Sequence, residues 1–181
     1  MTDPVPTPES LAQRALQDFR QGRFADAALG FEAARTSFEQ AGDVANAAEA
    51  ANNLCVALLQ ARRPAEALRA VEGTPEAFDG LGDPRRAAQA VGNLASALEA
   101  TGDLSAAERA YQQALQRFAD LNDREAQATI LSSVSQLQLK RGRPLEALTT
   151  MQAGLEQKPR RSWRDRWVRR LLDLPSRFLG H

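Results

Sequence analysis

The stretch that decides the fold is residues 84–121, which read PRRAAQAVGNLASALEATGDLSAAERAYQQALQRFADL. Its first half places Val91, Leu94 and Leu98 on one face of a helix with 3.6 residues per turn. Thr-Gly-Asp at 101–103 interrupts this pattern, and glycine readily adopts the left-handed conformation that ends a helix. A second helical pattern then runs to Leu121. The stretch therefore predicts two antiparallel helices joined by a tight turn.

The same pattern recurs at a spacing of 40 residues, without insertion, from residue 22 to residue 147. Related turn sequences begin at Gly22, Arg62, Gly102 and Gly142. A second series of helix boundaries contains Asp43, Asp83 and Asp123. We expect each of these aspartates to cap the following helix by accepting its free backbone N–H groups. The unit is a helical hairpin, repeated.

These residues resemble the tetratricopeptide repeat, in which small side chains let two helices pack closely. The best match is formed by Asn93-Leu94-Ala95, Gly102, Leu104, Ala107, Tyr111 and Ala114. The usual unit has about 34 residues, so a period of 40 is similar to the long-helix subclass seen in kinesin light chains. The resemblance implies an all-α fold, a right-handed superhelical solenoid of four helical hairpins followed by a C-terminal amphipathic helix.

This interpretation divides the chain into three regions. Residues 1–7 are expected to be a flexible lead-in, and residues 8–159 hold the four repeats, at about 8–41, 42–81, 82–121 and 122–159. Residues 160–181 form a basic tail. Repeat two carries Gly73-Thr74-Pro75 inside its second helix, where proline removes a backbone hydrogen bond. We expect this helix to break there, with Thr74 capping the remainder.

Composition argues against catalysis. The single histidine is the last residue of the chain, and no phosphate-binding loop or paired-cysteine motif is present. The only cysteine, Cys55, falls at the small-residue position of a hairpin contact, where a packing thiol is favoured over a nucleophile. The sequence therefore predicts no catalytic residues, no metal site, no cofactor and no enzymatic activity. Because no secretory signal follows Met1, we expect a cytoplasmic protein.

Recognition is the function that the resemblance implies. First helices of tetratricopeptide repeats line the concave wall of the superhelix. Carried onto this chain, the partner-binding groove would contain Asn52, Asn53, Gln89, Asn93, Ser96, Ser133, Gln136 and Lys140. Asn53 and Asn93 lie 40 residues apart and are expected to stack as a ladder of amides. Such amides either hold the backbone of a partner or join neighbouring hairpins, and the sequence leaves both open.

The tail is a second candidate site. Residues 158–181 hold eight basic and two acidic side chains, net +6, whereas the rest of the chain is net −6. The predicted tail surface consists of Trp163, Arg166, Trp167, Arg169, Arg170 and Leu171. A helix there either covers the apolar end of repeat four or lies on a membrane surface through its tryptophans and arginines. Nucleic-acid binding is a third interpretation, without a supporting motif.

These observations favour a non-catalytic protein–protein interaction adaptor or scaffold, which binds a peptide or protein partner in the concave groove. The alternative is a peripheral membrane-associated assembly factor, docked at the inner face of a membrane by its tail. No nucleic-acid partner is expected, because the total charge is balanced. The sequence gives no expectation of the oligomeric state.

Overall fold

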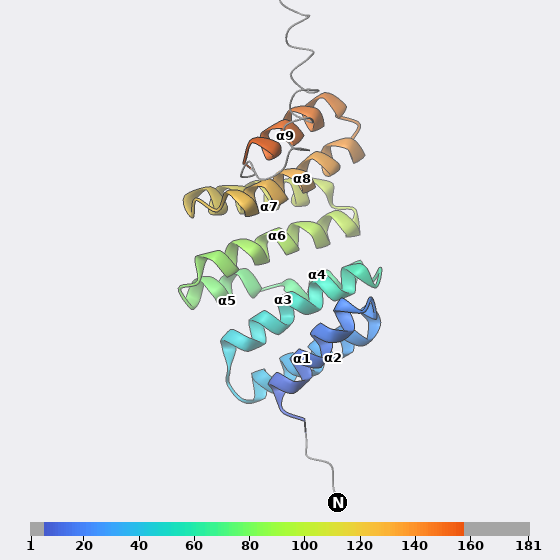
Figure 1. Ribbon diagram of the computed structural model, residues 1–181, viewed down its shortest axis with the longest axis vertical. Helices are drawn as coiled ribbons and strands as arrows, with labels where there is room; N and C mark the ends of the chain where they lie inside the picture. Colours follow the sequence, from blue (N-terminus) through green and yellow to red (C-terminus); the bar gives the residue numbers. More distant parts are fainter. Residues whose placement is uncertain (1–5, 158–181) are drawn as a thin grey trace, which may run out of the picture. The chain divides into compact units, whose positions relative to one another are not determined.

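The computed structural model describes residues 6–157, and within them nine helices follow one another without a strand (Figure 1). The helices are α1 (Pro8–Arg20), α2 (Phe24–Gln40), α3 (Val44–Gln60), α4 (Pro64–Val71), α5 (Thr74–Gly80), α6 (Pro84–Thr101), α7 (Leu104–Asp120), α8 (Arg124–Lys140) and α9 (Pro144–Gln157). This confirms the all-α helical-repeat fold that the sequence predicts. The expected helix at 160–181 lies outside the described residues.

Aspartate caps begin the helices as expected. The Oδ1 atoms of Asp43, Asp83 and Asp123 accept backbone N–H groups three residues ahead, at 3.1, 2.9 and 3.0 Å. At the other end of α6, Gly102 has φ +93°, a left-handed conformation that side chains disfavour. The short turns between helices therefore follow from capping residues that recur with the repeat.

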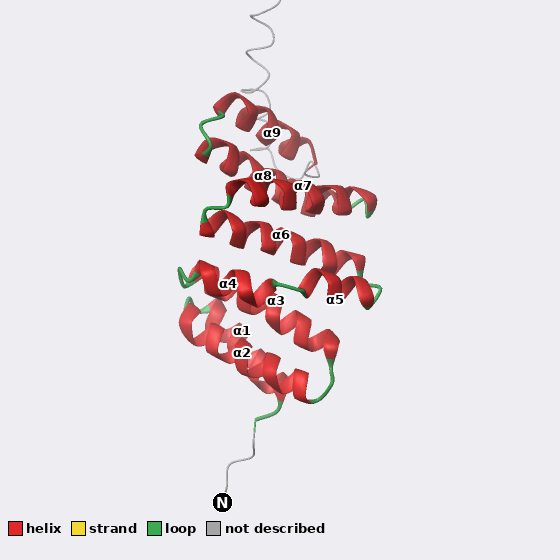
Figure 2. Ribbon diagram, turned by 180° about the vertical axis from the view of Figure 1, so that it is seen from behind, coloured by secondary structure: helices red, strands yellow, loops and turns green. Residues whose placement is uncertain are grey.

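The break in the second helix of repeat two is confirmed, but its cap is not Thr74. Helix α4 ends at Val71 and α5 begins at Thr74, with a short connection between them (Figure 2). Gly73 takes the capping position at φ +76°, and no side chain caps the helix. A β-branched threonine is poorly suited to that conformation, whereas glycine adopts it freely. Thr74 is instead buried in the first turn, ahead of Pro75.

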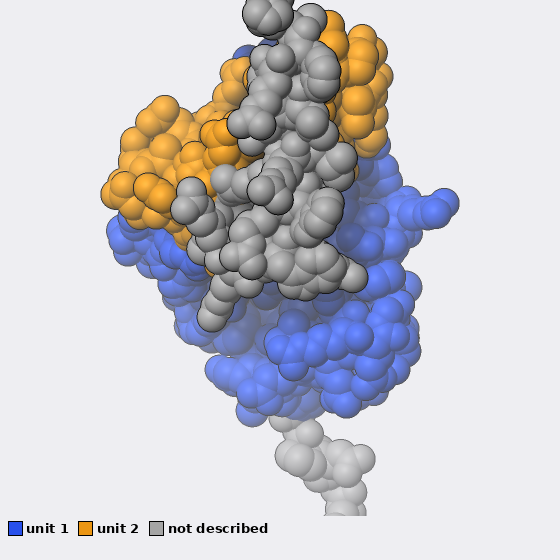
Figure 3. Space-filling model, turned by 45° about the horizontal axis from the view of Figure 1, so that its top comes forward, with its two compact units in different colours: residues 1–110 blue, residues 111–181 orange. Residues whose placement is uncertain are grey.

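The chain divides into two compact units, residues 1–110 and 111–181 (Figure 3). The division falls inside α7 and coincides with none of the expected repeat boundaries, which stay a prediction. Unit 1 contains α1 to α6 and the start of α7. Unit 2 contains the rest of α7, α8 and α9. Each unit is described by itself below.

Alanine dominates the core of unit 1. Helix α2 packs against both α1 and α3, and α6 packs against α3, α4 and α5. One cluster joins Phe31 of α2 to Leu54 and Leu58 of α3. The approach of α1 and α2 is close enough that a Cβ atom on Gly30 would lie 2.8 Å from the Cβ of Ala15. Small side chains thus set how closely the helices of unit 1 approach each other.

Unit 2 is held by the packing of α8 against α9. The buried Ser135 hydroxyl donates a hydrogen bond of 3.0 Å to the carbonyl oxygen of Ala147. Gly154 of α9 is also buried, and a Cβ atom there would meet the Cβ of Leu131 at 3.3 Å. The hairpin therefore combines one interhelical hydrogen bond with a close glycine contact.

Candidate functional site

Five predicted groove residues lie on the two contacting first helices of unit 1, α3 and α6. We call this set the amide row: Asn52, Asn53, Gln89, Asn93 and Ser96. On each helix these residues span an arc of about 100° or less, since successive residues are about 100° apart. Asn52 is buried, Gln89 is exposed, and the other three are half-buried.

An amide hydrogen bond joins the two helices. The Nδ2 of Asn93 donates to the Oδ1 of Asn52 at 2.8 Å. The expected ladder of Asn53 with Asn93 is thus wrong by one residue. Equivalent positions in two repeats share a role, but their side chains meet only where the helices actually approach, and the more buried amide is the one that needs an internal partner. For Asn52 and Asn93, joining of hairpins is the observed role.

Asn53 is left in a different situation. Its half-buried amide has no hydrogen-bond partner anywhere in residues 6–157. Gln89, on α6, is exposed and equally unpaired among the residues that the structure describes. An amide group offers two donor hydrogens and an acceptor oxygen, which suits the N–H and C=O groups of a peptide backbone. These two amides are the free part of the row.

Arg86 connects α3 and α6 on the same arc of α6 as Gln89. Its guanidinium contacts the carboxylate of Asp83 at 2.6 Å and that of Glu49 on α3 at 3.2 Å. It also lies 5.0 Å from the ring centre of Phe78. The backbone N–H and guanidinium of Arg86 stabilise the Asp83 carboxylate and lower its pKa. At this end of the row, the Arg86–Glu49 ion pair therefore joins α6 to α3, whereas the Arg86–Asp83 pair lies within the start of α6.

The three remaining groove residues lie on α8, in unit 2. Ser133, Gln136 and Lys140 follow the i, i+3, i+7 spacing of one helix face. Gln136 and Lys140 are exposed. The half-buried Ser133 hydroxyl donates to the carbonyl oxygen of Thr129 at 3.5 Å, the longest such bond on this helix. Unit 2 thus carries its own polar helix face, and its role in binding stays a prediction.

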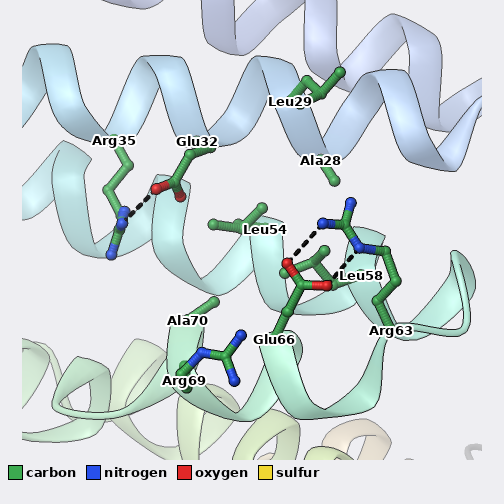
Figure 4. A pocket seen from close by; sticks show the side chains of 10 residues that line it. All are labelled: Ala28, Leu29, Glu32, Arg35, Leu54, Leu58, Arg63, Glu66, Arg69 and Ala70. Carbon is green, nitrogen blue, oxygen red and sulfur yellow. Dashed lines mark hydrogen bonds and ion pairs between the residues drawn. The ribbon is translucent and has the colours of Figure 1, made fainter.

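A hollow that the sequence did not predict lies in unit 1 between α2, α3 and α4, with a volume of about 320 Å³ (Figure 4). Leu54 and Leu58 contribute buried apolar side chains to it. Figure 4 shows Glu66 paired with the guanidinium of Arg63, with N–O distances of 2.7 and 2.6 Å. The hydrogen bond from Arg63, together with the positive charge of Arg69, which also lines the hollow, lowers the pKa of Glu66.

A second hollow, of about 360 Å³, adjoins the break between α4 and α5. Gly73 and Thr74 line it from the break, and Val44 lines it from α3. Arg35 and Ala70 line both hollows, so the two are neighbours. From the sequence alone, the charged residues that line these hollows look like ordinary solvent-exposed residues of separate helices. Only the packing of α2 and α4 over α3 brings these residues into one place.

The described residues show no catalytic cluster. Cys55 is fully buried, and its Sγ donates to the Asn93 carbonyl oxygen at 3.9 Å. Burial raises the pKa of this thiol to about 12, the opposite of what an activated nucleophile needs. No group of potential metal ligands occurs between residues 6 and 157. No helix in that part of the chain is both long and apolar enough to cross a bilayer. The predicted tail surface lies outside the described residues.

Paired helices, alanine-rich contacts and a polar row on first helices define a helical-repeat protein. Residues 86–160 match the family model of the tetratricopeptide repeat. The crystal structure of BtubC (BKLC) from P. vanneervenii has a similar fold, with a TM-score of 0.73 and 20% identity over 86% of this chain and 68% of that chain. A search of curated proteins found no match. The long-helix subclass stays a prediction.

Proposed function

We propose that this protein is a non-catalytic adaptor that binds a peptide or protein segment along the amide row. Tetratricopeptide repeats generally mediate protein–protein interaction, which supports the class of function. The observation that carries the proposal is the half-buried amide of Asn53, which has no partner among residues 6–157. It lies on α3 next to Asn52, the residue that accepts the hydrogen bond from Asn93 of α6. A half-buried amide without a partner gains more from a ligand hydrogen bond than one that is fully hydrated.

The row separates a structural part from a binding part. The Asn93–Asn52 bond joins the helices, whereas Asn53 and Gln89 keep their hydrogen-bonding groups available. On α8, Ser133, Gln136 and Lys140 provide a separate polar surface within unit 2. A partner that runs along α3 and α6 in an extended conformation would present a backbone donor and acceptor at every residue. Its own side chains would then decide specificity.

The compartment proposed for this adaptor is the cytoplasm. The chain holds one cysteine, which is buried and free, so its fold uses no disulfide. Recognition by amides also needs no cofactor. We therefore propose that binding, without chemical turnover, is the whole contribution of the described region.

A displayed library of random peptides provides a test that needs no known partner. Peptides selected on the intact protein are measured for affinity to the Asn53→Ala and Gln89→Ala variants. Each variant should weaken binding by roughly fivefold, since a neutral hydrogen bond contributes about 1 kcal/mol. Thermal stability should not fall below that of wild type, because neither side chain has an internal partner and alanine is the better helix former.

Arg69→Ala is the matched control for this experiment. Arg69 lines the hollow between α2 and α4 and lies outside the amide row. Loss of peptide affinity in Arg69→Ala, with Asn53→Ala and Gln89→Ala unaffected, would move the binding site to that hollow and contradict the proposal. A library that yields no binding peptide to the intact chain would contradict it as well.

A further inference from the structure

Helix α9 carries an apolar stripe in which two large side chains are exposed in the structure. Ala147 and Gly154 face α8 and are buried. Beside them, at helical spacing, Leu148 and Met151 are 46% and 44% exposed, and Leu155 is half-buried. We call Leu148, Met151 and Leu155 the α9 stripe. Single exposed leucines are ordinary on a surface, but three apolar side chains on one helix face form a patch.

The equivalent positions of earlier repeats are closed. Met151 corresponds, at the 40-residue spacing, to Phe31, Val71 and Tyr111, which are only 2%, 0% and 2% exposed. Phe31 belongs to a buried cluster that includes Leu54 of α3, the following first helix. The position of Met151 is thus one that a following helix normally covers. Among residues 6–157, nothing follows α9.

Helix α1, at the N-terminal end of the repeats, carries charged side chains at positions that are apolar in α3. Leu54 and Leu58 of α3, which contact the preceding hairpin, correspond to Arg14 and Asp18 of α1. Arg14 is exposed, and Asp18 pairs with the guanidinium of Arg23. That end therefore meets water with charged side chains. The apolar α9 stripe has no such substitution, which indicates that it faces another apolar surface.

We propose that the α9 stripe is covered by the chain's own tail, through an amphipathic helix spanning about residues 163–174. Only the five residues 158–162 separate α9 from this segment, a normal length for a connection between antiparallel helices. A helix of twelve residues is about 18 Å long, and the 14-residue α9 is about 21 Å long. The two helices match in length.

The sequence of the tail provides the complementary face. At 100° per residue, Trp163, Trp167, Leu171 and Leu174 fall on one side of this helix. Large side chains there suit a stripe whose own members are flexible, because Met and Leu repack readily around an indole ring. The net charge of +6 in residues 158–181, against −6 for the rest of the chain, further favours association within one molecule. Neither reason depends on the amide row.

Intrinsic fluorescence tests the proposal directly, since both tryptophans of the chain lie in the tail. In the intact protein, docking predicts blue-shifted emission and weak quenching by acrylamide. Met151→Asp places a charge in the stripe, so it should shift the emission to the red and raise quenching severalfold. Leu145→Asp is the matched control on the same helix. Leu145 is 81% exposed outside the stripe, so its replacement should leave the emission unchanged.

Four results would overturn the proposal. The first is wild-type emission as red-shifted as that of the urea-unfolded chain. The second is emission that Met151→Asp leaves unchanged. A blue shift that disappears on dilution would assign the stripe to a second copy, and one that arises only with phosphatidylserine vesicles would assign the tail to a membrane. Far-UV circular dichroism checks that each variant stays helical. If Met151→Asp unfolds, the milder Leu148→Gln gives the same contrast.

Discussion

The hydrogen bond between Asn93 and Asn52 gives a prediction whose size follows from burial. Replacing Asn93 by alanine leaves the Oδ1 of Asn52, in a residue only 6% exposed, without its partner. A buried unsatisfied group costs about 1–3 kcal/mol. Replacing Asn52 instead leaves the Nδ2 of the half-buried Asn93, which water can reach, so the lost bond costs only about 0.5–1.5 kcal/mol. Asn93→Ala should therefore be the more destabilising variant.

A double-mutant cycle isolates the bond from helix propensity. Alanine favours a helix over asparagine by roughly 0.5 kcal/mol, and this gain occurs in both single variants and cancels in the cycle. The coupling energy between the two sites should be about 1 kcal/mol. Urea unfolding followed by far-UV circular dichroism measures the four proteins. Asn53→Ala combined with Asn93→Ala is the control pair and should be additive.

A coupling energy for Asn52 and Asn93 below about 0.3 kcal/mol, the level at which unconnected sites add, would show that their hydrogen bond contributes nothing to stability. Coupling of Asn53 to Asn93 that is stronger than that of Asn52 to Asn93 would contradict this pairing. That outcome would restore the original ladder and make Asn53 a structural residue.

Three further predictions concern packing, titration and local opening. Gly30→Ala should destabilise unit 1 by roughly 1–2 kcal/mol, because its new methyl group would clash with the Cβ of Ala15. Gly80→Ala, with open space around it, should be neutral or stabilising by up to about 1 kcal/mol. Equal urea midpoints for the two variants would contradict this. The stability contributed by the protonated Cys55 thiol should be constant below its unfolded pKa of about 9 and fall as the pH rises toward 12, because the unfolded thiol ionises first; Cys55→Ala should abolish this slope. Amides at 71–78, around the break, should exchange hydrogen faster than those at 111–118 in the unbroken α7, and equal protection would show that the break is rigid.

The sequence predicted the helices because their boundaries depend on local chemistry that recurs. Asp83 caps α6 and Gly102 ends it through interactions within a few residues, so a 40-residue register of such signals was sufficient. The Gly73-Thr74-Pro75 break was also local. Its cap was assigned to the wrong residue because the prediction weighed side-chain hydrogen bonding and overlooked the left-handed backbone that glycine provides.

Contacts between helices were less predictable. The register correctly indicated that amides would meet between α3 and α6, but it selected Asn53 where the structure uses Asn52. The offset depends on how the two helices pack, which a repeat spacing does not contain. The hollow beside Arg69 was missed for the same reason, because its walls come from α2 and α4, two helices that are not consecutive in the chain.

The hydrogen bond between the Asn93 and Asn52 side chains also bears on how α3 and α6 are aligned along each other. Alanines form much of their interface, and small, uniform side chains would pack almost as well if one helix slid along the other by a turn. Such a slip would separate Asn52 from Asn93 and leave a buried amide dry. The Asn52–Asn93 pair therefore favours one alignment of α3 and α6 over the others. A helical hairpin inserted between α3 and α6, or exchanged for another, would stack in a single arrangement only if it carried a matching amide.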